Sequence, residues 1–171
     1  MHPKYNVIES FTGLLIFEIS GREYCLNYSI VASMLRPPFE IINNCGEDNQ
    51  GYSIITLKNG TVPLINLKEL LKQRGSGRIE KKDSRVIIIE NHNEHFGLLV
   101  EKIKEVFALD PKYITTSVKF NPETDLPDKF VGNNFSEGFL EIEGRSLQLL
   151  NIEKLIDTVQ IFNKEAEDTH F

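Results

Sequence analysis

Leu14-Leu15-Ile16-Phe17-Glu18 is repeated 72 residues later as Val86-Ile87-Ile88-Ile89-Glu90. Each stretch is an apolar run that ends in glutamate and is followed by a polar turn and a second apolar run. The correspondence continues without a gap through the pairs Tyr24 and Phe96, Leu26 and Leu98, Val31 and Ile103, and Met34 and Val106. A self-similarity of this length marks a repeated structural unit, so the sequence predicts a duplicated fold.

A second correspondence follows further along the chain. Residues 57–71 match residues 142–156, now at an offset of 85. Each copy has the pattern of a hairpin followed by a short amphipathic helix, with Asn66 and Asn151 at the positions of helix N-caps. Asn59-Gly60 is a strong hairpin-turn signal. Both halves of the chain are therefore expected to contain the same elements in the same order.

The increase in offset places about 13 extra residues in the second copy, between Phe107 and Gly138. This stretch is rich in proline, asparagine and aspartate, and we expect a long exposed loop there. The polar segment 73–84 is the expected connection between the two copies.

The fold class follows from the period-2 apolar runs, which are typical of strands. The expected fold is mainly β, with two SH3-like five-stranded barrels related by internal duplication and with short helices, because closure hides the sheet edges. The domain is expected over 12–157, with subdomains at about 12–73 and 85–157. Residues 1–11 and 158–171 are expected to be terminal extensions.

Composition narrows the classes of function. The chain has 171 residues, 40% of them hydrophobic, and a net charge of −6. Such an acidic protein without a cluster of Lys and Arg is a poor binder of nucleic acid. Residues 1–11 do not have the pattern of a signal peptide, and no apolar run approaches the roughly 20 residues of a membrane span. Cys25 and Cys45 are expected to be reduced thiols, since two cysteines do not make a disulfide framework.

The sequence offers little evidence for a metal site or a catalytic site. His92 and His95, with Glu90 and Glu94 nearby, have the residue types of a zinc site, but the segment reads better as a hairpin turn. Neither Cys25 nor Cys45 has a histidine near it in the chain, and Gly75-Ser76-Gly77 lacks the spacing of a phosphate-binding loop. We therefore expect no metal, no cofactor and no enzymatic activity.

An alternative function is a small-barrel module that binds nucleic acid or a small ligand. Small barrels often stack bases on aromatic side chains. The residues that suggest such a platform are Phe120, Phe130, Phe135 and Phe139. The acidic net charge argues against it, and core or loop-anchoring roles are expected for these side chains.

The chain resembles the CheW-like family of chemotaxis coupling proteins. Residues 62–67, Val-Pro-Leu-Ile-Asn-Leu, are similar to the family's V-P-V-I-D-L strand. Residues 85–88 and 96–103 are similar to its R-I-I-V and G-L-L-V-D-x-V runs, and residues 146–155 to its closing strand and helix. The resemblance implies two intertwined five-stranded SH3-like barrels. It also implies a cytoplasmic adaptor, recruited to membrane-associated receptor arrays, that joins a CheA-type histidine kinase to the coiled-coil tip of a chemoreceptor.

The resemblance also implies where a receptor tip would bind. The candidate residues are Val31, Ser33, Lys58, Asn59 and Gly97. Three of them depart from the family pattern: Ser33 stands in place of Glu, Lys58 in place of Arg, and Asn59 in place of Gly. Ser33 and Lys58 cannot form the charge-assisted bond of a Glu–Arg pair. The departures therefore bear on the choice of partner more than on the fold.

Overall fold

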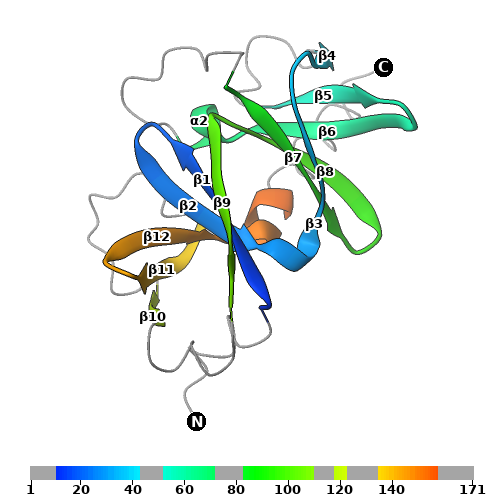
Figure 1. The fold of residues 1–171 in the computed structure, drawn as a ribbon. Coiled ribbons are helices and arrows are strands. Elements are labelled where there is room, and N and C mark those ends of the chain that lie inside the picture. The colour runs from blue at the N-terminus through cyan, green and yellow to red at the C-terminus, as the bar shows by residue number, and fades with distance from the viewer. Residues whose placement is uncertain (1–10, 43–51, 72–82, 110–117, 123–134, 158–171) are drawn as a thin grey trace.

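The computed structural model describes residues 11–42, 52–71, 83–109, 118–122 and 135–157. These residues form two curled sheets of six strands each, with short helical segments (Figure 1). The prediction of a mainly β fold with two barrel-like units is confirmed. Each sheet has six strands, one more than expected.

The two sheets are named here sheet A and sheet B. In spatial order, sheet A contains β10 (Val118–Pro122), β11 (Ser136–Ile142), β12 (Arg145–Leu150), β2 (Arg22–Asn27), β1 (Gly13–Ile19) and β9 (Lys102–Ala108). Sheet B contains β3 (Val31–Leu35), β7 (Arg85–Asn91), β8 (Glu94–Val100), β6 (Gly60–Asn66), β5 (Tyr52–Leu57) and β4 (Glu40–Ile42). Helical segments lie at η2 (Tyr28–Ile30), at α2 (Leu67–Leu70) and over 152–157.

Each half of the chain gives its first hairpin to the sheet of the other half. Hairpin β1–β2 pairs with β9 and β12, and hairpin β7–β8 pairs with β3 and β6. In Figure 1 the blue hairpin accordingly lies beside the gold β12, and the green β7 and β8 lie beside the teal β6. Each six-stranded sheet therefore contains strands from both of the predicted ranges, 12–73 and 85–157.

The duplication extends to the strand register. The parallel pair β12–β2 sets Leu149 opposite Cys25, and the parallel pair β6–β8 sets Leu64 opposite Gly97. Leu64 and Leu149 are equivalent residues of the two copies, and so are Cys25 and Gly97. The pairs β1–β9 and β3–β7 also shift register at equivalent places. Contacts in one sheet therefore indicate how the equivalent residues lie in the other.

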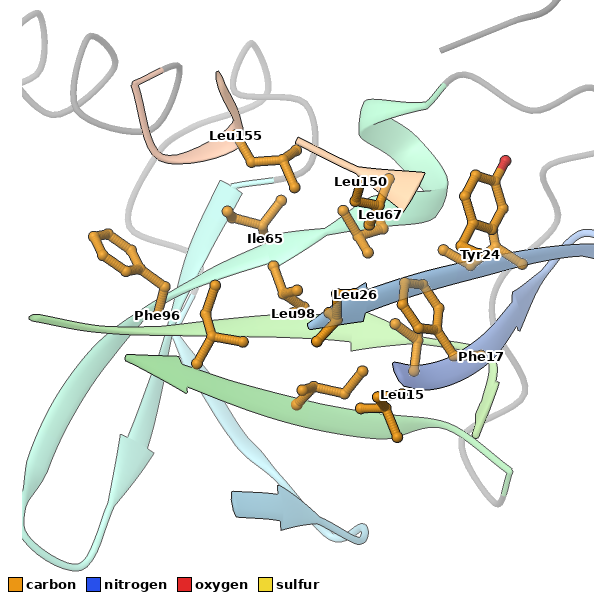
Figure 2. Close-up of a cluster of buried hydrophobic side chains, with 14 of the residues drawn as sticks. Leu15, Phe17, Tyr24, Leu26, Ile65, Leu67, Phe96, Leu98, Leu150 and Leu155 are labelled. Atoms are coloured by element: carbon orange, nitrogen blue, oxygen red, sulfur yellow. The ribbon is translucent and has the colours of Figure 1, made fainter. Parts of the chain in front are cut away.

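The hydrophobic core is shared between the sheets. Figure 2 shows side chains from β1, β2, β6, β8, β12 and α2 directed into one cluster. Along β1, Leu15 and Phe17 belong to this shared cluster, while Leu14 and Ile16 belong to a second cluster inside sheet A. Since β1 is buried on both faces, its run of apolar residues does not alternate.

The predicted turns and caps are confirmed. Ser20 and Gly21 have φ angles of 52° and 78°, and His92 and Asn93 have 50° and 66°. A left-handed backbone at both central positions is what a two-residue hairpin turn requires. Asn66 Oδ1 accepts a hydrogen bond from the amide of Lys68 at 3.1 Å. The equivalent Asn151 Oδ1 accepts one from the amide of Lys154, also at 3.1 Å.

One part of the expected loop between Phe107 and Gly138 is instead a strand. Residues 118–122 form β10, with Phe120 opposite Leu140 on β11. The loop prediction is wrong for these residues because β10 takes the place in sheet A that β4 takes in sheet B. Pro122 ends the strand at the outer position of the sheet, where its missing N–H costs little.

Candidate partner-binding surface

Strand β3 carries two of the predicted partner-binding residues, Val31 and Ser33. Within the described residues, β3 is the outermost strand on its side of sheet B. Val31 is half-buried, whereas Ser33 and Met34 are exposed, Met34 to 42%. The strand has no charged side chain. Edge strands of soluble proteins are usually protected by charge, so this edge is suited to contact another molecule.

A third predicted residue, Gly97, lies in the same cross-strand row as Ser33. Ser33 is opposite Ile88 on β7, Ile88 is opposite Gly97 on β8, and Gly97 is opposite Leu64 on β6. Residues opposite one another project from the same face of a sheet. Ile88 and Leu64 pack in the cluster inside sheet B, so Ser33 stands at the rim of that interior.

Gly97 itself is buried. A Cβ atom there would meet Leu64 Cδ1 at 3.0 Å and Val86 Cγ1 at 3.2 Å. This close packing explains a glycine at the position. Gly97 is thus placed in the packed interior of sheet B and not on an exposed surface.

The remaining two predicted residues, Lys58 and Asn59, form the exposed turn between β5 and β6. The position of this turn relative to Ser33 can be inferred from the duplication. The equivalents of Ser33 and Gly60 in sheet A are Glu105 and Arg145, whose side chains form an ion pair. With the same registers in both sheets, Ser33 lies toward the Lys58–Asn59 turn. A charge-assisted bond of the kind that Ser33 and Lys58 cannot make is found in sheet A, at the positions equivalent to Ser33 and Gly60.

The ion pairs of sheet A form a network, which we name the β9 network. The guanidinium of Arg145 donates to Glu23 through Nη2 (2.5 Å) and Nε (3.2 Å), and to Glu105 through Nη1. Lys104 Nζ lies 2.9 Å from Glu18 Oε2. The hydrogen bond from Arg145 holds the pKa of Glu23 below its usual value. The bond to Glu18 raises the pKa of Lys104.

The histidines considered for a metal site pair with carboxylates instead. His92 Nε2 lies 3.5 Å from Glu153 Oε1, and His95 Nε2 lies 4.0 Å from Glu90 Oε2. In the described ranges, no three His, Cys, Asp or Glu side chains come together as metal ligands would. The described helices are all too short or too polar to cross a bilayer.

The aromatic residues considered for binding nucleic acid are described only in part. Phe135 packs against the shared core. Phe139 lies on β11 and is partly buried. Phe130 lies outside the described residues, as does Cys45.

Two features of this surface were missed by the sequence reasoning. Met34 was aligned with Val106 but not selected, although both are exposed apolar residues at equivalent places, Val106 to 45%. The Arg145–Glu105 pair was also missed. The alignment of Glu105 with Ser33 was the available signal, but sequence alone does not show that Arg145 reaches it.

The fold defines a class of protein, a duplicated β-barrel protein. The chain belongs to the family of the CheW-like domain, whose model matches residues 13–160. Proteins of this family are non-enzymatic scaffolds of chemotaxis signalling, so the predictions of an adaptor and of no enzymatic activity are confirmed.

The fold is also similar to that of a solved structure. The crystal structure of the scaffolding protein TtCheW from Thermoanaerobacter tengcongensis matches with a TM-score of 0.66 and 22% sequence identity. The match covers 81% of this chain and 88% of that one. No curated protein sequence matches the chain.

Proposed function

We propose that this chain couples chemoreceptors to a CheA-type histidine kinase, in chemotaxis or a related signalling pathway. It works in the cytoplasm at receptor arrays, where it holds both partners at once. The receptor tip binds at the β3 edge of sheet B, and the regulatory domain of the kinase binds elsewhere on the barrels. Holding two partners on one chain raises the effective concentration of each near the other.

The observation that carries this proposal is the composition of the β3 edge. An exposed strand with Met34 and no charge offers an apolar strip. Exposed cations lie at Arg36, directly after the strand, and at Lys58 in the turn between β5 and β6. A partner helix with an apolar face and an acidic residue is complementary to that strip. Signalling then follows from differential contacts that shift the kinase between states, with no chemistry in this chain.

The test uses the Lys58→Glu variant in a binding assay with receptor-tip fragments and kinases from the chain's own organism. We expect receptor binding to weaken roughly tenfold, which corresponds to about 1.4 kcal/mol. The melting temperature should be nearly unchanged, because exposed substitutions usually alter stability by less than about 0.5 kcal/mol.

The matched control is Lys102→Glu, which makes the same charge change at an exposed lysine on β9 of sheet A. It should leave receptor binding at the wild-type level. Equal weakening by both variants would indicate a general charge effect, and unchanged binding by Lys58→Glu would exclude the turn from the interface.

A further inference from the structure

We propose that the β9 network closes the edge of sheet A to the helical partner, so that only one of the two duplicated edges is available for docking. This inference rests on the proposed function, because it concerns where the same partner binds. It assigns a specificity role to Lys104, Glu105 and Arg145.

The apolar residues of the two edges are nearly the same. Val31 and Ile103 are both half-buried, and so are Leu35 and Phe107. Met34 and Val106 are exposed to 42% and 45%. By its apolar residues alone, β9 would attract a partner helix about as well as β3, because both offer the same exposed strip.

The charged residues distinguish the edges. Where β3 has Ala32 and Ser33, β9 has Lys104 and Glu105. Where sheet B has Gly60, which has no side chain, sheet A has Arg145. The two copies therefore differ at the positions that lie beside the exposed apolar residue.

The charges on sheet A are held in place. Arg145 on β12 bonds to Glu23 on β2 and to Glu105 on β9, and thus spans the curled sheet. Lys104 is held at 2.9 Å from Glu18 on β1. An approaching apolar helix would have to strip water from these paired charges without replacing it, which is unfavourable. Glu18 and Glu23 lie opposite each other on β1 and β2, and their equivalents in sheet B are Glu90 and His95. There His95 Nε2 lies 4.0 Å from Glu90 Oε2, and Gly60 stands at the position of Arg145.

The experiment replaces the charged residues of the β9 network so that the β9 edge resembles the uncharged β3 edge. The triple variant Lys104→Ala/Glu105→Ser/Arg145→Ala is titrated calorimetrically with the receptor-tip helical hairpin, after its melting curve shows a folded chain. We expect wild type to bind one hairpin per chain and the triple variant to bind two. The control Lys102→Ala removes an exposed charge from β9 outside the network and should still bind one.

Two results would overturn the inference. A folded triple variant that still binds one hairpin shows that the network excludes nothing. A triple variant that loses binding places the partner on β9 itself.

A second readout separates this inference from the proposed function. An unprotected strand edge also pairs with other copies of the same chain. Wild type already has one uncharged edge at β3, so sedimentation velocity should show the triple variant self-associating more strongly with concentration than wild type, while Lys102→Ala stays at the wild-type level. If wild type binds no hairpin, the proposed function fails, and self-association of the triple variant still supports a closing role for the network. If no variant differs from wild type in either assay, the inference fails.

Discussion

Arg145 shows how one side chain can join distant parts of the chain. Its bond to Glu23 links residues 122 positions apart, and the guanidinium contacts carboxylates on two strands. Because Glu23 is only partly exposed, the pair is screened less than an isolated surface pair. The same bond sets the ionisation of Glu23, whose pKa lies below its usual value of 4.5.

This shift predicts a pH-dependent contribution to stability. A carboxyl with a depressed pKa in the folded state stabilises the fold above its unfolded value of 4.5, and the stabilisation is lost as the pH falls through the folded pKa. Arg145→Ala should therefore lower the free energy of unfolding by about 1 kcal/mol at pH 7. Urea denaturation at several pH values should show the gap to wild type narrowing below pH 4.5. A gap that stays constant down to acid pH would assign the loss to packing instead.

Cys25 is completely buried inside sheet A, and burial raises the pKa of its thiol. Only the thiolate reacts readily with disulfide reagents, so the folded chain should protect Cys25. The variant Cys45→Ser leaves Cys25 as the only thiol. Ellman's reagent should label it slowly in native buffer and completely in guanidinium chloride. Rapid labelling of the folded variant would show that β1 and β2 open frequently.

At the scale of elements, strands, turns and caps repeat faithfully between the two copies. The turns at Ser20–Gly21 and His92–Asn93 and the caps at Asn66 and Asn151 were predictable because each depends on residues close together in the chain. Strand β10 was not predictable in the same way. Its stretch has the composition of a loop, and it becomes a strand because β11 provides hydrogen-bond partners.

The caps give a prediction at this scale. Asn151→Ala removes the side-chain acceptor for the amide of Lys154 and should cost about 1 kcal/mol of stability. Asn66→Ala should cost a similar amount, since it makes the same kind of bond. Thermal unfolding measures both. The control Asn151→Asp keeps an acceptor oxygen and should retain most of the stability; a loss equal to that of Asn151→Ala would contradict a capping role.

At the scale of the whole molecule, the two sheets are joined by the shared core and by the places where the backbone passes from one sheet to the other. Glu101 lies where the chain passes from β8 of sheet B to β9 of sheet A. Its Oε1 lies 2.7 Å from Lys68 Nζ on α2, and its Oε2 accepts a hydrogen bond from the amide of Ser20. One carboxylate thus connects three segments at the junction of the sheets.

The duplicated junction is built differently. The equivalents of Ser20, Lys68 and Glu101 are His92, Glu153 and Ser29. His92 and Glu153 lie 3.5 Å apart, with side chains 81% and 62% exposed. The side chain of Lys68, in contrast, is only 11% exposed. The first junction is therefore expected to be the stronger of the two.

Two substitutions test this difference. Lys68→Met leaves Glu101 partly buried without its cation and should lower the free energy of unfolding by roughly 1–3 kcal/mol, between the values for exposed and buried pairs. Glu153→Gln should cost less than about 0.5 kcal/mol. Chemical denaturation of both variants, of Glu101→Leu and of Lys68→Met/Glu101→Leu measures the coupling between Lys68 and Glu101. Equal effects of the two single substitutions would show that burial of the Lys68–Glu101 pair adds nothing.

The strands, turns and helix caps could be predicted from local patterns of side chains, and the duplication from the recurrence of those patterns along the chain. The exchange of the first hairpins between sheets, and the formation of the ion network on β9 and not on β3, became visible in the folded chain and could not be predicted from local patterns. The continuous apolar run of β1 is compatible with either sheet, so its partner depends on packing over the whole core. The bond of Arg145 to Glu105 likewise depends on how sheet A curls, which brings together strands that no local pattern connects.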